Sequence, residues 1–316
     1  MIDQTLASYS DWTYGAAVGV YVLAMFLYLV EQAFGRRAKA IDRARAFRVL
    51  AGAGGPDTTE GTTEEPPEVR EGAGRAERFG RMAVALTVLG AVLHLASLAL
   101  RAAATGRAPW GNMYEYGSAV CLVAVITWLV LVRRFPVRRL GVFVLLPVVI
   151  LMFLGGVVFY ADAAPVQPAL RSYWLVIHVF LISSGSGMLL VPGVVSILYL
   201  LKVRRPELAS RLPEADVLDR IAYRTTIFAF PVYTIGVICG AIWAEEAWGR
   251  FWGWDPKETV AFVAWVVYAA YLHSRATAGW RGGRAAAINT AGFAVMIFNL
   301  FFINLVVSGL HSYAGT

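Results

Sequence analysis

Charged residues are scarce in this chain of 316 residues. Asp, Glu, Lys and Arg make up 16% of it, whereas hydrophobic residues make up 58%, and the mean hydropathy is positive. So few charges cannot coat a soluble globule of this size with polar surface. The scarcity excludes a soluble enzyme and predicts an all-α integral membrane protein.

Cysteine is nearly absent as well. Cys121 and Cys239 each stand alone in an apolar run, and no C-x-x-C spacing occurs. This excludes a dithiol redox centre, so we expect two buried structural thiols. The first eleven residues also lack the basic start and cleavage pattern of a secretory leader. We therefore expect the apolar stretch that follows to be kept as a span.

Long apolar runs fill most of the chain. A helix needs about 20 apolar residues to cross a bilayer, and eight stretches approach this length. They are residues 12–34, 80–102, 113–132, 140–160, 173–201, 222–244, 259–274 and 286–309. The sequence therefore predicts a bundle of about eight transmembrane helices, with both termini on one side of the membrane.

Lys and Arg are distributed unevenly among the loops. The net charge is +7, and 23 of the 28 basic residues lie in or beside the loops after the first, third, fifth and seventh spans. Because basic loops stay in the cytoplasm, we expect both termini to be extracytoplasmic. Basic residues in this pattern are topology signals, so the net charge does not indicate nucleic-acid binding.

One long loop divides the chain into three parts. Residues 1–34 hold the first span, residues 35–79 are expected to be a cytoplasmic tether, and residues 80–316 form a seven-span core without a soluble domain. The basic start of the tether, Arg36 to Arg48, is expected to lie on anionic lipid as a short amphipathic helix. Residues 51–74 are acidic and rich in Gly, Pro and Thr, and we expect them to be disordered.

One loop of the core is rich in tryptophan. Residues 246–258 combine aromatic rings, glycines and a carboxylate: Trp248, Phe251, Trp252 and Trp254, Gly249 and Gly253, then Asp255, Pro256, Lys257 and Glu258. An aromatic belt at the membrane interface needs one or two such rings per helix end and no glycine spacers. We call residues 246–258 the tryptophan loop, and it predicts a site for a planar apolar ligand.

All four histidines lie inside or at the ends of predicted spans. His178 is one turn inside span five and His311 follows span eight, so both are expected at the level of the tryptophan loop. Two imidazoles beside an aromatic surface suit six-coordinate haem iron, which takes one axial nitrogen on each face of the ring. These residues predict a haem site on the extracytoplasmic side.

The other two histidines predict a second site. His94 lies in span two, and His273 ends a short span seven: the 14 residues between Glu258 and His273 cover about 21 Å of a hydrocarbon core about 30 Å thick. A polar group at membrane depth costs a few kcal/mol unless it is paired or ligated. We therefore expect His94 and His273 to form an in-membrane bis-histidine pair. A zinc site is disfavoured because ligands do not converge at short spacing, and a proton relay through Glu115 remains an alternative.

The motif W-G-x-F-W-x-W-D between two outward-facing histidines resembles the signature of the haem-handling proteins of cytochrome c maturation. Three branches share it. The eight spans, the length and two further segments make the chain most similar to the system II family called CcsA or ResC (CcsB in some lineages). Those segments are Asn112-Met113-Tyr114-Glu115 at the start of span three and Gly309-Leu310-His311-Ser312-Tyr313-Ala314 near the end.

The resemblance, which covers spans two to eight, implies site residues and partners. Haem b is then the cargo. His178 and His311 are its external axial ligands, Trp248, Trp252, Trp254 and Asp255 its platform, and His94 and His273 its in-membrane ligands. The family works in the bacterial cytoplasmic membrane with a partner called ResB or Ccs1, which has a large extracytoplasmic domain. Together they join haem to the C-x-x-C-H motif of apocytochrome c, so the chain is expected to be the haem-handling subunit of a synthase complex.

Haem also carries two propionates, for which the sequence offers three cations near the outer ends of spans. These candidates are Arg101, Arg171 and Lys257. Two other functions remain open from the sequence. A cytochrome b with resident haem, passing electrons to a quinone, would also use paired histidines but does not need the tryptophan loop. A transporter of another amphiphilic solute would use the histidines as proton sites and would hold no haem.

Overall fold

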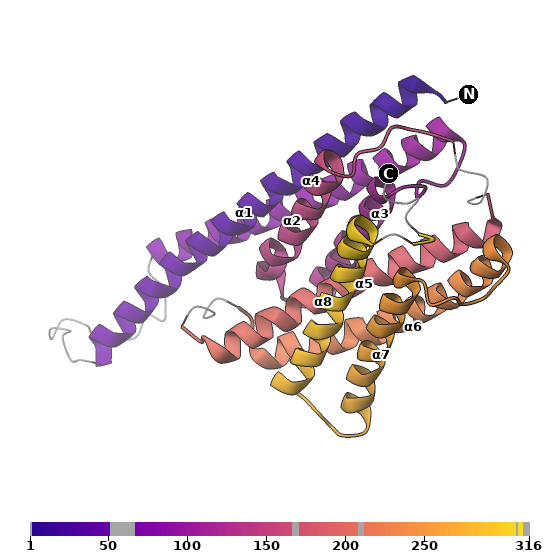
Figure 1. The fold of residues 1–316 in the computed structure, drawn as a ribbon. Helices are drawn as coiled ribbons and strands as arrows, with labels where there is room; N and C mark the ends of the chain where they lie inside the picture. The colour runs from indigo at the N-terminus through magenta and orange to yellow at the C-terminus, as the bar shows by residue number, and fades with distance from the viewer. Residues whose placement is uncertain (1, 51–66, 166–170, 208–211, 308, 312–316) are drawn as a thin grey trace.

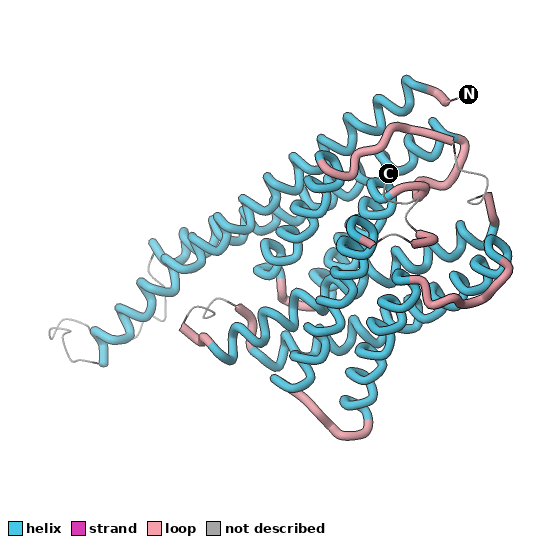
Figure 2. Tube along the Cα trace, viewed as in Figure 1, coloured by secondary structure: helices cyan, strands magenta, loops and turns pink. Residues whose placement is uncertain are grey.

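Eight α-helices make up most of the chain. The structure is a computed structural model that describes residues 2–50, 67–165, 171–207, 212–307 and 309–311. Within these ranges it contains helices and loops but no strand (Figure 2). The helices are α1 (Gln4–Leu50), α2 (Pro67–Thr105), α3 (Met113–Arg134), α4 (Gly141–Val157), α5 (Tyr173–Arg204), α6 (Ala215–Trp248), α7 (Pro256–Ala276) and α8 (Gly283–Val306), with a 3-10 turn η1 (Arg138–Leu140) before α4.

Two long antiparallel pairs set the architecture. Helix α1 packs mainly on α2, and α5 packs mainly on α6, as Figure 1 shows. Helix α3 contacts both pairs, through α2 on one side and α5 on the other, while α8 packs on α5 and α7. The main buried cluster draws on α1 to α6 and includes Tyr21, Trp128 and Leu145, each with an exposed fraction of 0%. Helices α5 to α8 share a second, smaller buried cluster that includes Tyr233, Tyr268 and Met296.

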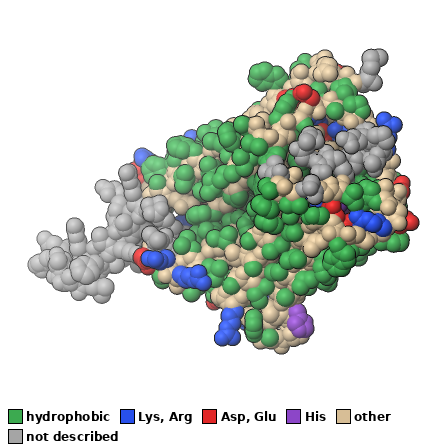
Figure 3. Space-filling view, viewed as in Figure 1, with side chains coloured by type: hydrophobic (Ala, Val, Ile, Leu, Met, Phe, Trp, Pro, Cys, Tyr) green, Lys and Arg blue, Asp and Glu red, His purple; other side chains and the backbone are tan. Residues whose placement is uncertain are grey.

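Seven of the described helices are long and apolar enough to cross a membrane. The seven are α1 to α6 and α8. Helix α7 has 21 residues but falls outside this set because polar residues, among them Lys257 and Arg275, lower its hydropathy. Hydrophobic side chains cover most of the face seen in Figure 3, with charged side chains mainly toward its margins. The predicted all-α membrane fold is confirmed, and the chain is a multi-pass membrane protein.

The loops gather at two ends of the bundle. At one end the Asp3 N–H donates to the Ala104 carbonyl at 3.0 Å, and the Leu310 N–H donates to Asp255 Oδ1 at 2.8 Å. We call this the tryptophan-loop end. At the other end, where the α7–α8 loop lies, Arg275 pairs with Asp219 at 2.6 Å. This grouping follows from the antiparallel order of successive helices in the bundle, whereas the assignment of either end to the cytoplasm remains a prediction from charge.

The helices on either side of the predicted tether, residues 35–79, both extend into it. Helix α1 continues to Leu50 and α2 begins at Pro67, so the expected disorder is wrong for residues 67–74, and residues 51–66 lie outside the described part. The segment from Arg36 to Arg48 continues α1 and is not a separate helix. Polar residues can prolong α1 because extending an existing helix avoids the cost of nucleation. Helix α2 can begin at Pro67 because proline suits the first helical position.

Glycines let α5 and α6 approach closely. A Cβ atom on Gly185 would lie 2.7 Å from the Tyr233 Cα, and a Cβ atom on Gly236 would lie 2.9 Å from the Ile182 backbone nitrogen. Both distances are shorter than real Cβ contacts, so only glycine allows the two backbones to touch. Close packing through small residues is the usual way in which membrane helices associate. It places His178 of α5 directly against α6.

Candidate functional site

A cavity lies between α3, α5, α6, α7 and α8 at the tryptophan-loop end. Most of its lining side chains are apolar or aromatic, which suits a planar apolar ligand. The ring-bearing and polar residues that line it are Tyr116, His178, Trp243, Trp248, Trp252, Lys257, Glu258, Asn299, Asn304 and His311. Of the predicted haem ligands it brings together His178 and His311.

His178 is held in one orientation by α6. Its Nδ1 lies 2.8 Å from the Gly236 carbonyl oxygen, and its ring stacks on Trp243 with centroids 6.1 Å apart and planes 8° apart. A carbonyl oxygen only accepts, so Nδ1 must carry the proton and Nε2 must carry the lone pair. Gly240 makes room for this ring, since a Cβ atom there would lie 2.6 Å from the His178 Cε1.

His311 is held by a carboxylate in the same way. Its Nδ1 lies 2.8 Å from Asp255 Oδ2, and its ring meets Trp248 edge to face at 5.2 Å and Trp243 at 6.0 Å. A carboxylate that accepts from Nδ1–H fixes Nε2 as the basic nitrogen. Both imidazoles thus stand around one indole, Trp243, and each is arranged in the tautomer that binds a metal through Nε2.

Asp255 links this ligand position to the start of α7. Its Oδ2 also accepts from the Lys257 N–H at 3.2 Å, and Glu258 Oε2 accepts in return from the Asp255 N–H at 3.1 Å, which completes a capping box. Burial alone would raise the pKa of the Asp255 carboxyl, but the hydrogen bonds from His311 and Leu310 outweigh burial and hold that pKa below its usual value. Asp255 is therefore ionised at neutral pH.

The three predicted platform tryptophans lie in different positions. Trp248 and Trp252 line the cavity, whereas Trp254 is 67% exposed and is not among the lining residues. Trp254 adopts a left-handed backbone with φ of 57°, which costs an L-residue about 1–2 kcal/mol, and its ring packs edge to face on Trp252 at 5.9 Å. Trp254 therefore supports the loop from outside the cavity.

Sequence reasoning missed Trp243 and the two glycines of α6 that pack against α5. Trp243 is 1% exposed and sits inside a predicted span, where a tryptophan resembles ordinary core. The signal that was available is the G-x-x-x-G spacing of Gly236 and Gly240 in an apolar helix, which predicts close packing against a neighbour. That spacing marks the face of α6 against which His178 lies.

The structure does not bring His94 and His273 together. His94 is 0% exposed, with Nε2 at 2.8 Å from Ser118 Oγ and Nδ1 at 3.4 Å from the Tyr21 hydroxyl. His273 is exposed in the last turn of α7, a helix that packs on α6 and α8, whereas α2 packs on α1 and α3. The two residues of the predicted in-membrane pair therefore lie apart in this structure. Residue spacing estimates depth in the membrane, but it does not say which helices are neighbours.

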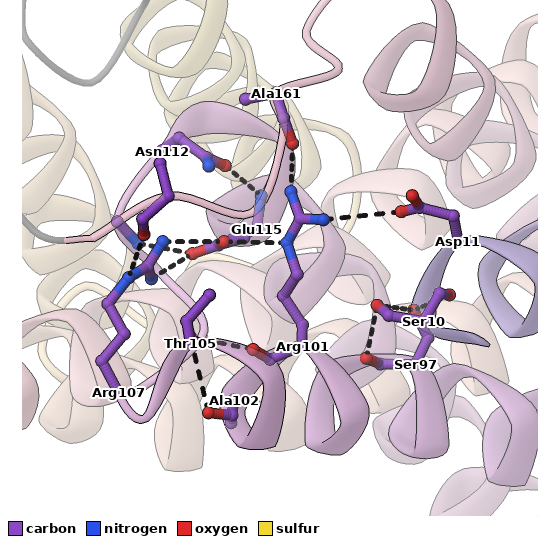
Figure 4. Close-up of polar contacts among 12 residues, drawn as sticks. Ser10, Asp11, Ser97, Arg101, Ala102, Thr105, Arg107, Asn112, Glu115 and Ala161 are labelled. Atoms are coloured by element: carbon purple, nitrogen blue, oxygen red, sulfur yellow. Dashed lines mark hydrogen bonds and ion pairs between the residues drawn. The ribbon is translucent and has the colours of Figure 1, made fainter. Parts of the chain in front are cut away.

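Arg101 belongs to a buried ion network beside the cavity (Figure 4). Its Nε lies 3.1 Å from Glu115 Oε1, its Nη1 lies 3.5 Å from Asp11, and its Nη2 donates to the Ala161 carbonyl. Arg107 reaches the other oxygen of Glu115 at 2.7 Å. With its oxygens engaged, Glu115 joins α2, α3 and the loop between them, which favours a structural role over a proton relay. Arg101 is not among the residues that line the cavity.

Lys257 is the one Lys or Arg side chain among the described residues that line the cavity. Its Nζ lies 3.4 Å from the Asn299 carbonyl oxygen and 5.9 Å from the centroid of the Tyr116 ring. Burial lowers the pKa of the Lys257 amine to about 7, and the nearby Asp255 charge opposes this effect only in part. The third candidate for a propionate, Arg171, is exposed and does not line the cavity.

The chain is similar to known proteins over the part that contains the cavity. A family model described as cytochrome C assembly protein matches residues 110–311, a range that contains His178, the tryptophan loop and His311 but not His94. The cytochrome c biogenesis protein CcsA of Parasynechococcus marenigrum (strain WH8102) is 34% identical over 263 residues, which are 72% of this chain and 85% of the relative. The CcsA of Guillardia theta is 39% identical over 172 residues, 48% of this chain and 57% of the relative.

A solved structure shares the fold. The cytochrome c heme lyase CcmF superposes with a TM-score of 0.62 at 19% sequence identity, and the match covers 94% of this chain and 46% of that chain. This chain thus spans less than half the length of that solved protein. At this identity the likeness supports the helical architecture and does not by itself assign an activity.

Proposed function

The chain belongs to the cytochrome c assembly protein family, and from this premise we propose that it binds haem b as cargo between His178 and His311 and presents it to apocytochrome c. Its relatives carry the name cytochrome c biogenesis protein CcsA, which supports a role for the chain in that process. Residues 80–316 form the haem-handling core, and the tryptophan-loop end faces away from the cytoplasm.

One observation carries the proposal: two imidazoles from different parts of the chain have their Nδ1 atoms tied to acceptors of the protein. The acceptors are the Gly236 carbonyl for His178 and the Asp255 carboxylate for His311. A histidine that ligates a metal almost always donates its other nitrogen in this way. Trp243, Trp248 and Trp252 line the same cavity as both rings and provide apolar contact for a macrocycle. The donor set therefore fits haem iron with two axial nitrogens.

The chain contributes ligand exchange and orientation. Two imidazoles hold low-spin iron and leave no open coordination position. The histidine of the C-x-x-C-H motif can then displace one imidazole, while the two thiols of that motif add to the haem vinyl groups. We expect His311 to be the ligand that is displaced, because it lies in the short segment after α8. His178 belongs to the long helix α5 and is less free to move. A partner of the ResB or Ccs1 type supplies the extracytoplasmic domain for the acceptor.

An apocytochrome chase tests this function against a resident cytochrome b. The full chain, purified with its partner and loaded with reduced haem b, is mixed with apocytochrome c that has an intact C-x-x-C-H motif or a motif with both cysteines replaced by serine. We expect haem to leave the chain and become covalently bound only with the intact motif. Haem that stays stoichiometric in both mixtures and is reduced by quinol would identify a resident cytochrome b. A chain that binds no haem would favour the transport alternative.

Asp255→Asn should weaken haem binding without disturbing α7. Asparagine caps a helix about as well as aspartate, so the start of α7 is retained, but the neutral amide no longer increases the basicity of His311. Changes of this kind next to a ligand cost about 10- to 100-fold in affinity. We expect a loss in that range when ferric haem is titrated into the full chain and Soret absorbance is followed. Asp162→Asn, which changes an exposed acidic side chain at the same end, is the matched control. Equal affinities for the two variants would contradict a role for Asp255 in holding the ligand.

A further inference from the structure

Lys257 places a cation in a cavity that is otherwise largely apolar. Its side chain extends from the first turn of α7, and its Nζ lies between α8 and α3, near the Asn299 carbonyl oxygen at 3.4 Å and over the Tyr116 ring at 5.9 Å. Among the described residues it forms no ion pair. A long contact to one carbonyl satisfies an amine with three donor hydrogens poorly. An anionic group in the cavity would complete its hydrogen bonding.

Three other cations at this end, Arg101, Arg107 and Arg250, are paired with carboxylates. Arg101 and Arg107 both contact Glu115, and Arg250 pairs with Glu258 at 3.4 Å while its guanidinium lies 5.6 Å from the centroid of the Trp248 ring. Glu258, the acidic residue of the cavity lining, is engaged as well, because it accepts from the Gly253 and Asp255 N–H groups at 2.9 and 3.1 Å. Within the described lining, the basic group without an ion pair is therefore the Lys257 amine.

Asn299 adds a second polar group at the same place. It is 8% exposed, it lines the cavity, and its Oδ1 has no hydrogen-bond partner among the described residues. A buried amide oxygen without a hydrogen bond destabilises the protein unless a ligand or a water molecule donates to it. Lys257 and Asn299 together form a small polar patch on the α7–α8 wall, whereas His178 stands on the α5–α6 wall.

We propose that Lys257 binds a propionate of the haem held between His178 and His311 and so determines which edge of the macrocycle faces the α7–α8 wall. This inference rests on the proposed function. The propionates and the vinyl groups of haem b lie on different edges of the ring, so binding a propionate here turns the vinyl edge away from Lys257 and Asn299. A carboxylate beside the amine would also favour its charged form. The residue thus selects a haem orientation and discriminates against porphyrins without free carboxylates.

Binding of ferric haem b and of its dimethyl ester tests this role. The ester keeps the iron and the macrocycle but has no negative charge at the propionates. In the full chain in detergent we expect the free acid to bind about tenfold more tightly than the ester, as a hydrogen bond between charged groups allows. Lys257→Met should reduce this ratio to about one, and Lys257→Arg should retain it. Arg171→Met, a change outside the cavity, should keep the wild-type ratio.

The ratio of the two affinities distinguishes this role from a general loss of structure. A loss of structure would lower the affinities for haem b and for its dimethyl ester equally. A Lys257→Met ratio equal to that of the wild type would overturn the inference. So would a wild-type chain that binds both ligands with the same affinity and a bis-histidine spectrum, although the proposed function would then stand. A wild-type chain that binds neither ligand would contradict both proposals.

Discussion

Replacing His178 or His311 with alanine is expected to lower holocytochrome c formation by at least about 100-fold. The reason is that each ring supplies one of two axial nitrogens, and the loss of a group that only supports a ligand already costs about 10- to 100-fold. The measurement is covalent haem in membranes of cells that depend on this chain, detected by peroxidase staining after denaturing electrophoresis. Both variants should be made in normal amounts, because His178 is partly exposed and the His311 side chain is 19% exposed.

Added imidazole provides the internal control for this expectation. Each alanine variant leaves a space the size of the missing ring, so free imidazole should restore part of the activity of both variants by supplying the lost nitrogen. Replacing His94 with glutamine should have no comparable effect, since His94 lies among Tyr21 and Ser118 and outside the cavity. Normal holocytochrome c in both alanine variants would show that the site has been assigned to the wrong residues.

Gly240→Ala is expected to abolish axial ligation by His178 while leaving the fold intact. The new Cβ atom would lie 2.6 Å from the His178 Cε1 and 2.7 Å from its Nδ1, so the ring must move and lose its hydrogen bond to the Gly236 carbonyl. Alanine in a helix interior is favoured over glycine by about 1 kcal/mol, so α6 should not be weakened. We expect haem binding to fall by at least about tenfold and the low-spin spectrum to be lost, as measured by haem titration.

A second glycine serves as the matched control. Gly19 also lies within a helix, and a Cβ atom there would have nothing within 4 Å. Gly19→Ala should therefore bind haem like the wild type. If Gly240→Ala kept both the wild-type affinity and the low-spin spectrum, the position of His178 against α6 would have no bearing on ligation.

The sequence predicts depth in the membrane better than it predicts neighbours. Apolar runs must be about as long as the bilayer is thick, so the spans and the loops that share an end follow from hydropathy. The placement of His178 and His311 at the tryptophan-loop end was predictable for the same reason. The pair of His94 and His273 was not assembled in the structure, because lateral packing depends on which helix faces fit together.

Two further differences have local causes. Trp243 was overlooked because a tryptophan inside an apolar run looks like core, and its role appears only when its ring is seen to contact both His178 and His311. Conversely, Trp254 belongs to the recognisable motif but points away from the cavity, since the left-handed turn before Asp255 directs its ring outward. A motif thus identifies the loop, whereas backbone conformation decides which of its rings meet the ligand.

Electron paramagnetic resonance of the ferric, haem-loaded full chain identifies the axial ligands of the iron directly. We expect a low-spin bis-imidazole signal from the wild type, conversion to a high-spin signal in both His178→Ala and His311→Ala, and an unchanged signal in His94→Gln. A low-spin signal that survives in both alanine variants, or a high-spin signal in the wild type, would contradict the claim that these two imidazoles hold the haem between them.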